Sequence, residues 1–188
     1  MMSSLTEKQC AYHLQKMRTR FNRLDLNHDG FISREDYELM ATKVQEYGKL
    51  NAENAESTRN AFMTVADALG LKPGVKIPVE EAARKANREF SAMATEKQLV
   101  FLKATHNPLF DALDLNKDGH ISSDEFKVYF QIIAPDISED EVTHSFNVID
   151  SNKDGEISRE EFIAAAFDFL HCFEETEISK VFFGRLLS

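Results

Sequence analysis

Three twelve-residue segments of the chain share one arrangement of oxygen-bearing side chains. They are DLNHDGFISRED at 25–36, DLNKDGHISSDE at 114–125 and DSNKDGEISREE at 150–161. In each segment an acid or amide stands at positions 1, 3 and 5, a serine at position 9 and an acid at position 12. Carboxylate, amide, hydroxyl and carbonyl oxygens suit a hard divalent cation such as Ca²⁺, which takes about six to eight of them. The pattern therefore predicts three cation-binding loops.

Each loop is expected to supply five side-chain ligands and the backbone carbonyl of position 7. In the first loop the ligands are Asp25, Asn27, Asp29, the carbonyl of Phe31, Ser33 and Asp36. In the loop at 114–125 they are Asp114, Asn116, Asp118, the carbonyl of His120, Ser122 and Glu125. In the loop at 150–161 they are Asp150, Asn152, Asp154, the carbonyl of Glu156, Ser158 and Glu161. Position 6 is glycine each time, because the backbone needs a positive φ where it turns around the ion.

The three loops have the form of the EF-hand, a helix–loop–helix unit that binds Ca²⁺. Solvated acidic turns are the plain alternative, but they do not explain three matches in register, each within its helical context. The first loop departs from the pattern at its last position, where Asp36 replaces the expected Glu. Asp is one methylene shorter, so bidentate contact requires the loop to contract. We therefore expect this site to bind Ca²⁺ more weakly, or to tolerate the smaller Mg²⁺.

Helices must hold each loop on both sides, and their signals are present. Before the first loop, apolar side chains recur at spacings of three and four, at Ala11, Leu14, Met17, Phe21 and Leu24. After it they recur at Tyr37, Met40, Val44 and Tyr47. The pairs Thr6 with Gln9 and Ser138 with Glu141 have the spacing of a capping box, which marks a helix start. Within each loop the serine at position 9 precedes the final acid by three residues, so it is expected to cap the exiting helix.

EF-hands pair through a short antiparallel β contact, and Ile32, Ile121 and Ile157 stand at its central position. The loops beginning at 114 and 150 form one pair. The first loop needs a partner, and GLKPGVKIPVEE at 70–81 supplies one, with Ile77 at the central position and Glu81 at the last ligand position. Its other ligand positions hold Gly70, Lys72 and Gly74. We expect this hand to keep the fold and to lack the metal.

The predicted fold is all-α, with four EF-hands in two pairs packed as one compact globule around an apolar interior. Residues 1–90 form the N-terminal pair, in which loop 25–36 is active and loop 70–81 is degenerate. Residues 91–188 form the C-terminal pair, in which both loops, 114–125 and 150–161, are active. A length of 188 residues with 43% hydrophobic content is enough to bury a core of this kind.

Composition excludes several classes of partner. A formal charge of −10 disfavours nucleic acid and anionic membrane surfaces. No apolar run approaches the about 18–20 residues that span a bilayer, and the opening residues show neither an export signal nor a myristoylation glycine. Cys10 and Cys172 lack metal-site or disulfide spacing. We expect a cytoplasmic monomer and, since phosphate loops and nucleophile elbows are missing, not an enzyme.

The chain contains fifteen Phe and six Met, and this ratio helps to distinguish a peptide-binding sensor from a protein with a packed core. Sensors that grip many peptides use flexible, Met-rich grooves. Here the aromatic residues gather near the C-terminus, at Phe162, Phe167, Phe169, Phe173, Phe182 and Phe183. Core packing is the plain interpretation of this cluster, and the alternative is that some of these rings line a cavity for an apolar ligand.

Longer stretches resemble one known family. AYHLQKMRTRFNRLDLNHDGFISREDYEL at 11–39, TRNAFMTVADALGLKPGVKIPVEEAA at 58–83 and DFLHCFEETEISKVFFGRLL at 168–187 are similar to the coelenterazine-binding (luciferin-binding) proteins of sea pansies. The resemblance includes the degenerate second hand and Asp36, and it weakens over 86–110. It implies an internal apolar cavity for coelenterazine, which Ca²⁺ binding releases to a luciferase. The related calcium-regulated photoproteins carry several Trp around the luciferin, and this chain has none.

The same resemblance implies candidate cavity residues. Arg23 matches an arginine of the luciferin pocket, and the alternative for it is a solvated residue beside an acidic loop. Met17 and Phe183 are candidates from their helical faces, and His13 is either a polar pocket contact or a surface histidine. Three functions stay open: a Ca²⁺-triggered luciferin carrier, a sarcoplasmic-type calcium buffer without a ligand, and a peptide-binding sensor.

Overall fold

The computed structural model describes residues 5–188; residues 1–4, on which the expectation of no export signal partly depends, lie outside the described part. The first half contains α1 (Glu7–Leu24), β1 (Phe31–Ser33), α2 (Arg34–Tyr47), α3 (Ala52–Ala68), β2 (Lys76–Pro78) and α4 (Val79–Ala92). The second half contains α5 (Thr95–Leu113), β3 (His120–Ser122), α6 (Ser123–Ile133), α7 (Glu139–Ile149), β4 (Glu156–Ser158), α8 (Arg159–His171) and α9 (Glu177–Val181). The chain is therefore mostly helical, as expected.

The helices begin where the sequence places their caps. Thr6 and Gln9 form a reciprocal capping box at the start of α1, with hydrogen bonds of 2.7 and 3.2 Å. Ser138 and Glu141 do the same for α7, with bonds of 2.8 and 3.2 Å. Each cap satisfies N–H groups that the first turn of a helix leaves without a partner.

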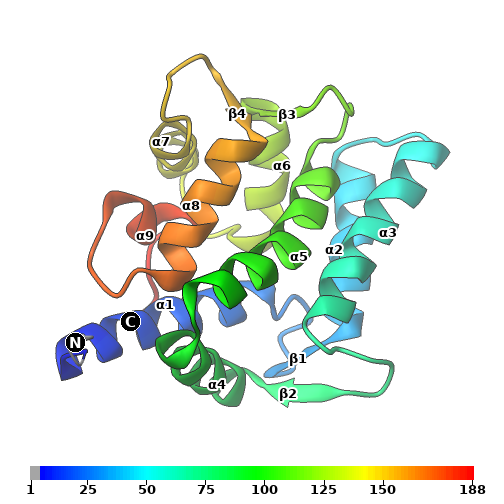
Figure 1. Ribbon diagram of the computed structural model, residues 1–188. Coiled ribbons are helices and arrows are strands. Elements are labelled where there is room, and N and C mark those ends of the chain that lie inside the picture. The colour runs from blue at the N-terminus through cyan, green and yellow to red at the C-terminus, as the bar shows by residue number, and fades with distance from the viewer. Residues whose placement is uncertain (1–4) are drawn as a thin grey trace.

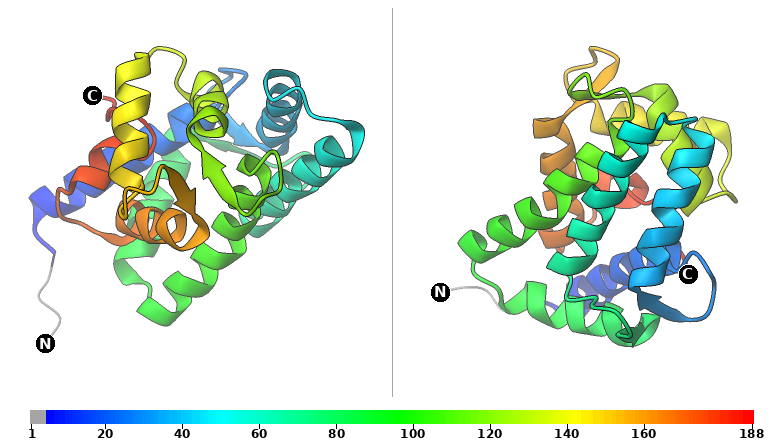
Figure 2. Two further views of the ribbon diagram at one scale, coloured as in Figure 1. Left: turned by 90° about the horizontal axis from the view of Figure 1, so that it is seen from above. Right: turned by 90° about the vertical axis from the view of Figure 1, so that its right-hand side faces the viewer.

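The four short strands join the hands in two pairs, as the central isoleucines predict. Strands β1 and β2 are antiparallel with Ile32 opposite Ile77, and β3 and β4 are antiparallel with Ile121 opposite Ile157. The degenerate hand thus keeps its strand although its loop lost the ligands. The two strand pairs lie at opposite ends of the molecule (Figures 1 and 2).

The helices of the two pairs share one core. In the first pair α1 packs against α4 and α2 against α3, while α3 also packs along α5 of the second pair. Further contacts between the pairs join α2 to α6 and α1 to α8. Helix α5 runs through the middle of the molecule, between α2 and α3 on one side and α8 on the other (Figure 1). The buried apolar side chains form a single cluster from Met17 to Phe183.

The aromatic residues near the C-terminus form much of that core. Phe162, Phe169, Phe182 and Phe183 are buried, and the ring centroids of Phe169 and Phe183 lie 5.0 Å apart. The segment after α9 returns along α1, where the Leu187 carbonyl accepts a hydrogen bond from the Gln15 side chain at 3.0 Å. Core packing therefore accounts for these four rings.

Two residues of the expected apolar faces are exposed, and Leu14 is half-buried. Ala11 is exposed, and Tyr47 keeps 51% of its surface exposed. Ala11 lies in the second turn of α1, and Tyr47 is the last residue of α2.

No helix within residues 5–188 has the length and apolar character needed to cross a bilayer. Cys10 and Cys172 are both free thiols.

Truncation of Phe169 tests the shared core. Phe169 is fully buried on α8 and contacts the rings of Phe182 and Phe183. Phe169→Ala should lower the free energy of unfolding by about 3–5 kcal/mol, because it leaves a cavity. Urea denaturation in excess Ca²⁺ measures this. The control is Val100→Ala, at a side chain 70% exposed, which should change stability by less than about 0.5 kcal/mol.

Candidate calcium loops and interior cavity

The three acidic loops share a hydrogen bond from the glycine at position 6 to the aspartate at position 1. In the first loop the Asp25 carboxylate accepts from the Gly30 N–H at 3.0 Å, and the same contact joins Gly119 to Asp114 and Gly155 to Asp150 at 3.0 Å. Gly30, Gly119 and Gly155 have φ of 83°, 92° and 90°, the left-handed region that glycine tolerates. Sequence and geometry agree on position 6.

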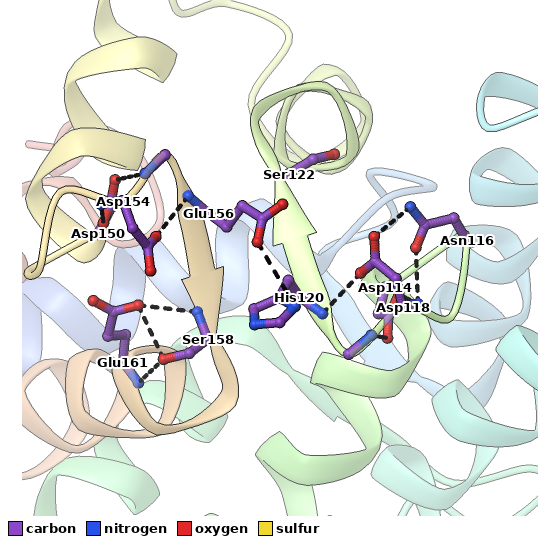
Figure 3. A network of polar contacts seen from close by, with 12 residues as sticks. Asp114, Asn116, Asp118, His120, Ser122, Asp150, Asp154, Glu156, Ser158 and Glu161 are labelled. Carbon is purple, nitrogen blue, oxygen red and sulfur yellow. Dashed lines mark hydrogen bonds and ion pairs between the residues drawn. The ribbon is translucent and has the colours of Figure 1, made fainter.

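Side chains at positions 3 and 5 accept hydrogen bonds from the backbone two residues further along the loop. In the loop at 114–125 the Asn116 side-chain oxygen accepts from the Asp118 N–H at 2.9 Å, and the Asp118 carboxylate accepts from the His120 N–H at 3.0 Å. The position 7 side chains of all three loops, Phe31, His120 and Glu156, are exposed. The predicted ligand at this position is the backbone carbonyl. Figure 3 shows the two loops of the second pair on either side of β3 and β4, with His120 and Glu156 facing each other between them.

The position 12 carboxylate joins the beginning of each loop to its end. Glu125 accepts from the N–H groups of Leu115 and Asn116 at 2.8 and 3.0 Å and, with its other oxygen, from the Ser122 N–H at 2.8 Å. Glu161 accepts from the Asn152 and Ser158 N–H groups, both at 3.0 Å. The third residue of the exiting helix is thus tied across the loop, so movement of this carboxylate moves the helix.

The carboxylate at position 12 is more deeply buried in the first loop than in the loop at 114–125. Asp36 accepts from the Leu26 N–H at 3.1 Å and from the Ser33 N–H at 2.9 Å, and it is 1% exposed against 8% for Glu125. The backbone at position 9 differs as well, with φ of −144° at Ser33 against −74° at Ser122. The shorter side chain is accommodated by this change of backbone.

A lysine of the degenerate hand enters the first loop. The Lys76 ammonium lies 2.9 Å from the carboxylate of Asp29, the predicted ligand at position 5, and holds the pKa of Asp29 below its usual range. An ion binding in this loop must therefore compete with a side-chain cation for one of its oxygens.

The buried carboxylates fit a bound cation. Five acids of the loops are less than 9% exposed, and no ion pair among residues 5–188 includes any of them: Asp25, Asp36, Asp114, Glu125 and Asp150. Burial raises the pKa of Asp36 and of Asp114, whereas hydrogen bonds from Ser158 and Asn152 outweigh burial and lower that of Glu161. Buried negative charge without a cation is costly.

Within residues 5–188 no three acid, His or Cys side chains already converge as a metal cage. The loop carboxylates are turned toward backbone N–H groups, and further ligands are the amide, hydroxyl and carbonyl oxygens of the same loops. Closing on an ion therefore requires a small rotation of each carboxylate toward the loop centre.

A small cavity lies in the interior, where the two pairs meet. Its volume is about 20 Å³. Its lining includes Arg20, Leu24, Tyr37, Met40, Phe62, His106, Leu109, Tyr129 and Phe183. Sites that enclose a drug-sized ligand hold about 300–1,000 Å³. In this conformation, side chains fill the interior.

Of the four cavity residues expected from the sequence, Phe183 lines this cavity. His13 and Met17 are fully buried elsewhere in the core. The His13 ring stacks on Phe173 with centroids 4.1 Å apart, and its Nε2 bonds the Leu170 carbonyl at 2.7 Å, so it is not a surface histidine. Arg23 is 7% exposed and forms an ion pair with Asp136. Their roles toward a ligand stay predictions.

Sequence reasoning did not single out the polar groups that do line the cavity. Arg20, Tyr37, His106 and Tyr129 are each less than 5% exposed. A signal was present for Arg20, which stands three residues after Met17 and so lies on the apolar stripe of α1. A basic residue on an apolar stripe is a buried charge, and buried charges call for a partner.

Fold and loops together define the class: a four-hand EF-hand calcium-binding protein. The family model for an EF-hand domain pair matches residues 103–167, and an EF-hand model matches residues 17–41. The luciferin-binding protein of Renilla reniformis is 47% identical over 184 residues, which cover 97% of this chain and 99% of the relative. The chain belongs to the luciferin-binding protein family. The resemblance drawn from the sequence is confirmed.

Solved structures agree. The coelenterazine-binding protein of Renilla muelleri, in its Ca²⁺-loaded apo form, matches with a TM-score of 0.91 and 46% identity, over 97% of this chain and 100% of the other. A sarcoplasmic calcium-binding protein of Hediste diversicolor is 34% identical over 65% of this chain and 70% of its own. Calcium-loaded apo-aequorin of Aequorea victoria shares the fold, with a TM-score of 0.67 and 23% identity, over 88% of this chain and 94% of its own.

The buried histidines predict a pH dependence of stability. Burial lowers the pKa of His106 to about 3, whereas an unfolded His titrates near its ordinary value of about 6.5. Protons therefore bind the unfolded chain first, and stability falls as the pH drops from about 6.5 toward 3. His106→Gln should reduce the loss of unfolding free energy between pH 7.5 and 5.0 by about 2 kcal/mol, because one such proton is removed.

Urea denaturation at the two pH values, in excess Ca²⁺, provides the measurement. The same change at the exposed His144 is the control and should leave the pH dependence as in the wild type. Equal pH dependence in all three proteins would contradict the assignment.

Proposed function

We propose that this chain is a Ca²⁺-triggered carrier, which holds coelenterazine in its interior and releases it to a luciferase when Ca²⁺ binds. The observation that carries the proposal is the end-to-end likeness to a luciferin-binding protein, at 47% identity. A second observation supports it. The chain superimposes on a Ca²⁺-loaded apo form, and its interior is too small for a luciferin. This is the arrangement expected after release.

The helices explain how loops and interior are coupled. Asp25 caps the end of α1, which carries Arg20, and Asp114 caps the end of α5, which carries His106. The same two helices therefore supply both the first ligand of a loop and the lining of the cavity. Bound Ca²⁺ would supply the positive charge that the loop carboxylates lack. Without it the carboxylates repel one another, so the loops relax and the lining helices move apart.

We further propose three metal sites, at the ligands named from the sequence in loops 25–36, 114–125 and 150–161, with residues 1–90 and 91–188 acting as the two hand pairs. The first site is the weak one and accepts Mg²⁺. Support comes from the short Asp36 side chain, and from Lys76, which occupies the Asp29 carboxylate. The role proposed here is binding rather than catalysis, in a cytoplasmic monomer, and the two free thiols fit a reducing compartment.

A calcium buffer is the second candidate, because sarcoplasmic calcium-binding proteins are also relatives and the filled interior suits a protein with no ligand. A peptide-binding sensor is a third. It predicts that Ca²⁺ raises the fluorescence of a hydrophobic dye, whereas the other two predict a fall.

Loading with coelenterazine separates carrier from buffer. The metal-free protein, mixed with coelenterazine and passed through a sizing column, should co-elute with one equivalent of a visible absorption band. Excess Ca²⁺ should remove the band, and by linkage coelenterazine should weaken Ca²⁺ binding by the same factor. A colourless protein peak, or a band that Ca²⁺ leaves in place, rules out the carrier.

Metal titration tests the first loop. Asp36→Glu should raise Ca²⁺ affinity at one of three sites and lower its tolerance of Mg²⁺, because the longer side chain reaches the ion with both oxygens. Lys76→Met should also raise Ca²⁺ affinity, since it frees Asp29. Calorimetry of the chelator-stripped proteins, with Lys72→Met as the control in the same degenerate loop, gives both values. Unchanged Ca²⁺/Mg²⁺ preference in Asp36→Glu would refute the explanation, as would a wild-type stoichiometry clearly other than three.

A further inference from the structure

Arg20 is a buried cation without a partner. Its side chain is 3% exposed, and it makes no hydrogen bond or ion pair to any residue of the described range 5–188. Its Nε is buried and unbonded, and its guanidinium carbon lies 5.0 Å from the centroid of the Phe21 ring. A buried charge of this kind costs stability unless another group neutralises it.

The groups around Arg20 do not neutralise it. Those that interact with it electrostatically are Tyr37, Tyr129, His106 and His171. All four are neutral at pH 7, because burial raises the pKa of the tyrosines and lowers that of the histidines. No carboxylate stands among them, so the position lacks one negative charge.

A second set of unpaired atoms lies beside it. Both ring nitrogens of His171 are buried and have no hydrogen-bond partner among the described residues. The His171 ring contacts the Phe90 ring edge to face, with centroids 4.8 Å apart. Phe90 lines the same groove as Arg20. Arg20 therefore has unused hydrogen-bonding capacity in the wall of that groove, and the ring nitrogens of His171 have it behind Phe90.

The groove itself is apolar and open to solvent. It has a volume of about 320 Å³ and lies between α1, α4, the first turns of α5 and the segment that follows α3. Its apolar lining includes Phe21, Ile32, Ala86, Phe90, Met93 and Phe101. Lys85 and Glu89 stand at the exposed rim, 3.9 Å apart. Met93 and Phe101 continue it to a surface hollow beside Val100, which is 70% exposed.

We propose that this groove is a ligand site separate from the interior cavity, for an amphiphile whose single anionic oxygen group binds Arg20 and whose apolar body lies along α4 toward Phe101. Two sources share this chemistry: a fatty acid and an aromatic luciferin in its ionised form. The groove has the volume of a small-molecule site, whereas the interior cavity does not. The inference does not depend on the luciferin-carrier proposal.

Binding of cis-parinaric acid, a fluorescent fatty acid, to the full-length Ca²⁺-loaded protein tests this site. We expect about one equivalent to bind. Arg20→Gln should weaken binding about ten- to a hundred-fold, because a hydrogen-bonded charge pair is lost. The methyl ester of the same acid should bind the wild type with a similar loss. The matched control is Arg18→Gln on the same helix, whose side chain is 40% exposed and bonds Glu80; its affinity should equal that of the wild type.

A second pair of variants tests the groove independently of charge. Ala86→Trp fills the groove, since Ala86 lies in its wall, and should abolish binding. Ala92→Trp, at an exposed position on the same helix, should bind like the wild type. Displacement of parinaric acid by coelenterazine would assign the groove to luciferin, and no displacement would assign it to fatty acids.

The inference is overturned if parinaric acid does not bind, or if Arg20→Gln and Ala86→Trp bind it like the wild type. This result would leave the carrier proposal open, because retention of coelenterazine by the metal-free Ala86→Trp protein is measured in a separate experiment.

Discussion

The structure depends on negative charge that is buried at helix junctions and that pairs with no Lys, Arg or His side chain of residues 5–188. Asp25, Asp114 and Asp150 each end an incoming helix, and each is about 4–6% exposed. The position 12 acids lie in the first turn of the outgoing helices and are tied by hydrogen bonds back to the start of the loop. Repulsion between these acids acts directly on the helices that they join, so metal binding and helix position are parts of one equilibrium. This is the physical basis for a calcium-controlled interior.

The interior carries the opposite imbalance. Lys16, Arg20 and Arg23 stand at intervals of four and three along α1, so all three fall on its buried face. Lys16 donates to the Cys172 carbonyl at 2.6 Å and Arg23 pairs with Asp136, whereas Arg20 has no partner among residues 5–188. Negative charge is thus concentrated in the loops at the two ends of the molecule, and positive charge on the buried face of α1, which the net charge alone does not reveal. The loops suit cations, and the interior suits a ligand with an electron-rich oxygen.

The degenerate hand has a structural and an electrostatic role. Its strand β2 completes the pairing with β1, and Ile77 lies opposite Ile32, although the loop has lost its ligands. Its Lys76 reaches the Asp29 carboxylate of the first loop. The hand without an acidic loop thus places a cation on the neighbouring loop. Contacts of α3 with α5 and of α2 with α6 link the first pair to the second. A movement of helices in either pair therefore changes the packing of the shared core.

Much of this protein was determined by local sequence. The positive-φ glycines, the capping serines Ser122 and Ser158 and the strand isoleucines are set by spacings within about twelve residues, and backbone geometry enforces those spacings wherever the loop folds. Hence the fold class, the hand pairs and the degenerate loop followed from the sequence. Tertiary packing alone decided the rest. It buried His13 against Phe173, paired Arg23 with Asp136 and left Arg20 alone between the groove and the interior cavity. Such partners come from distant segments, and a one-dimensional pattern does not specify which side chains meet across a core.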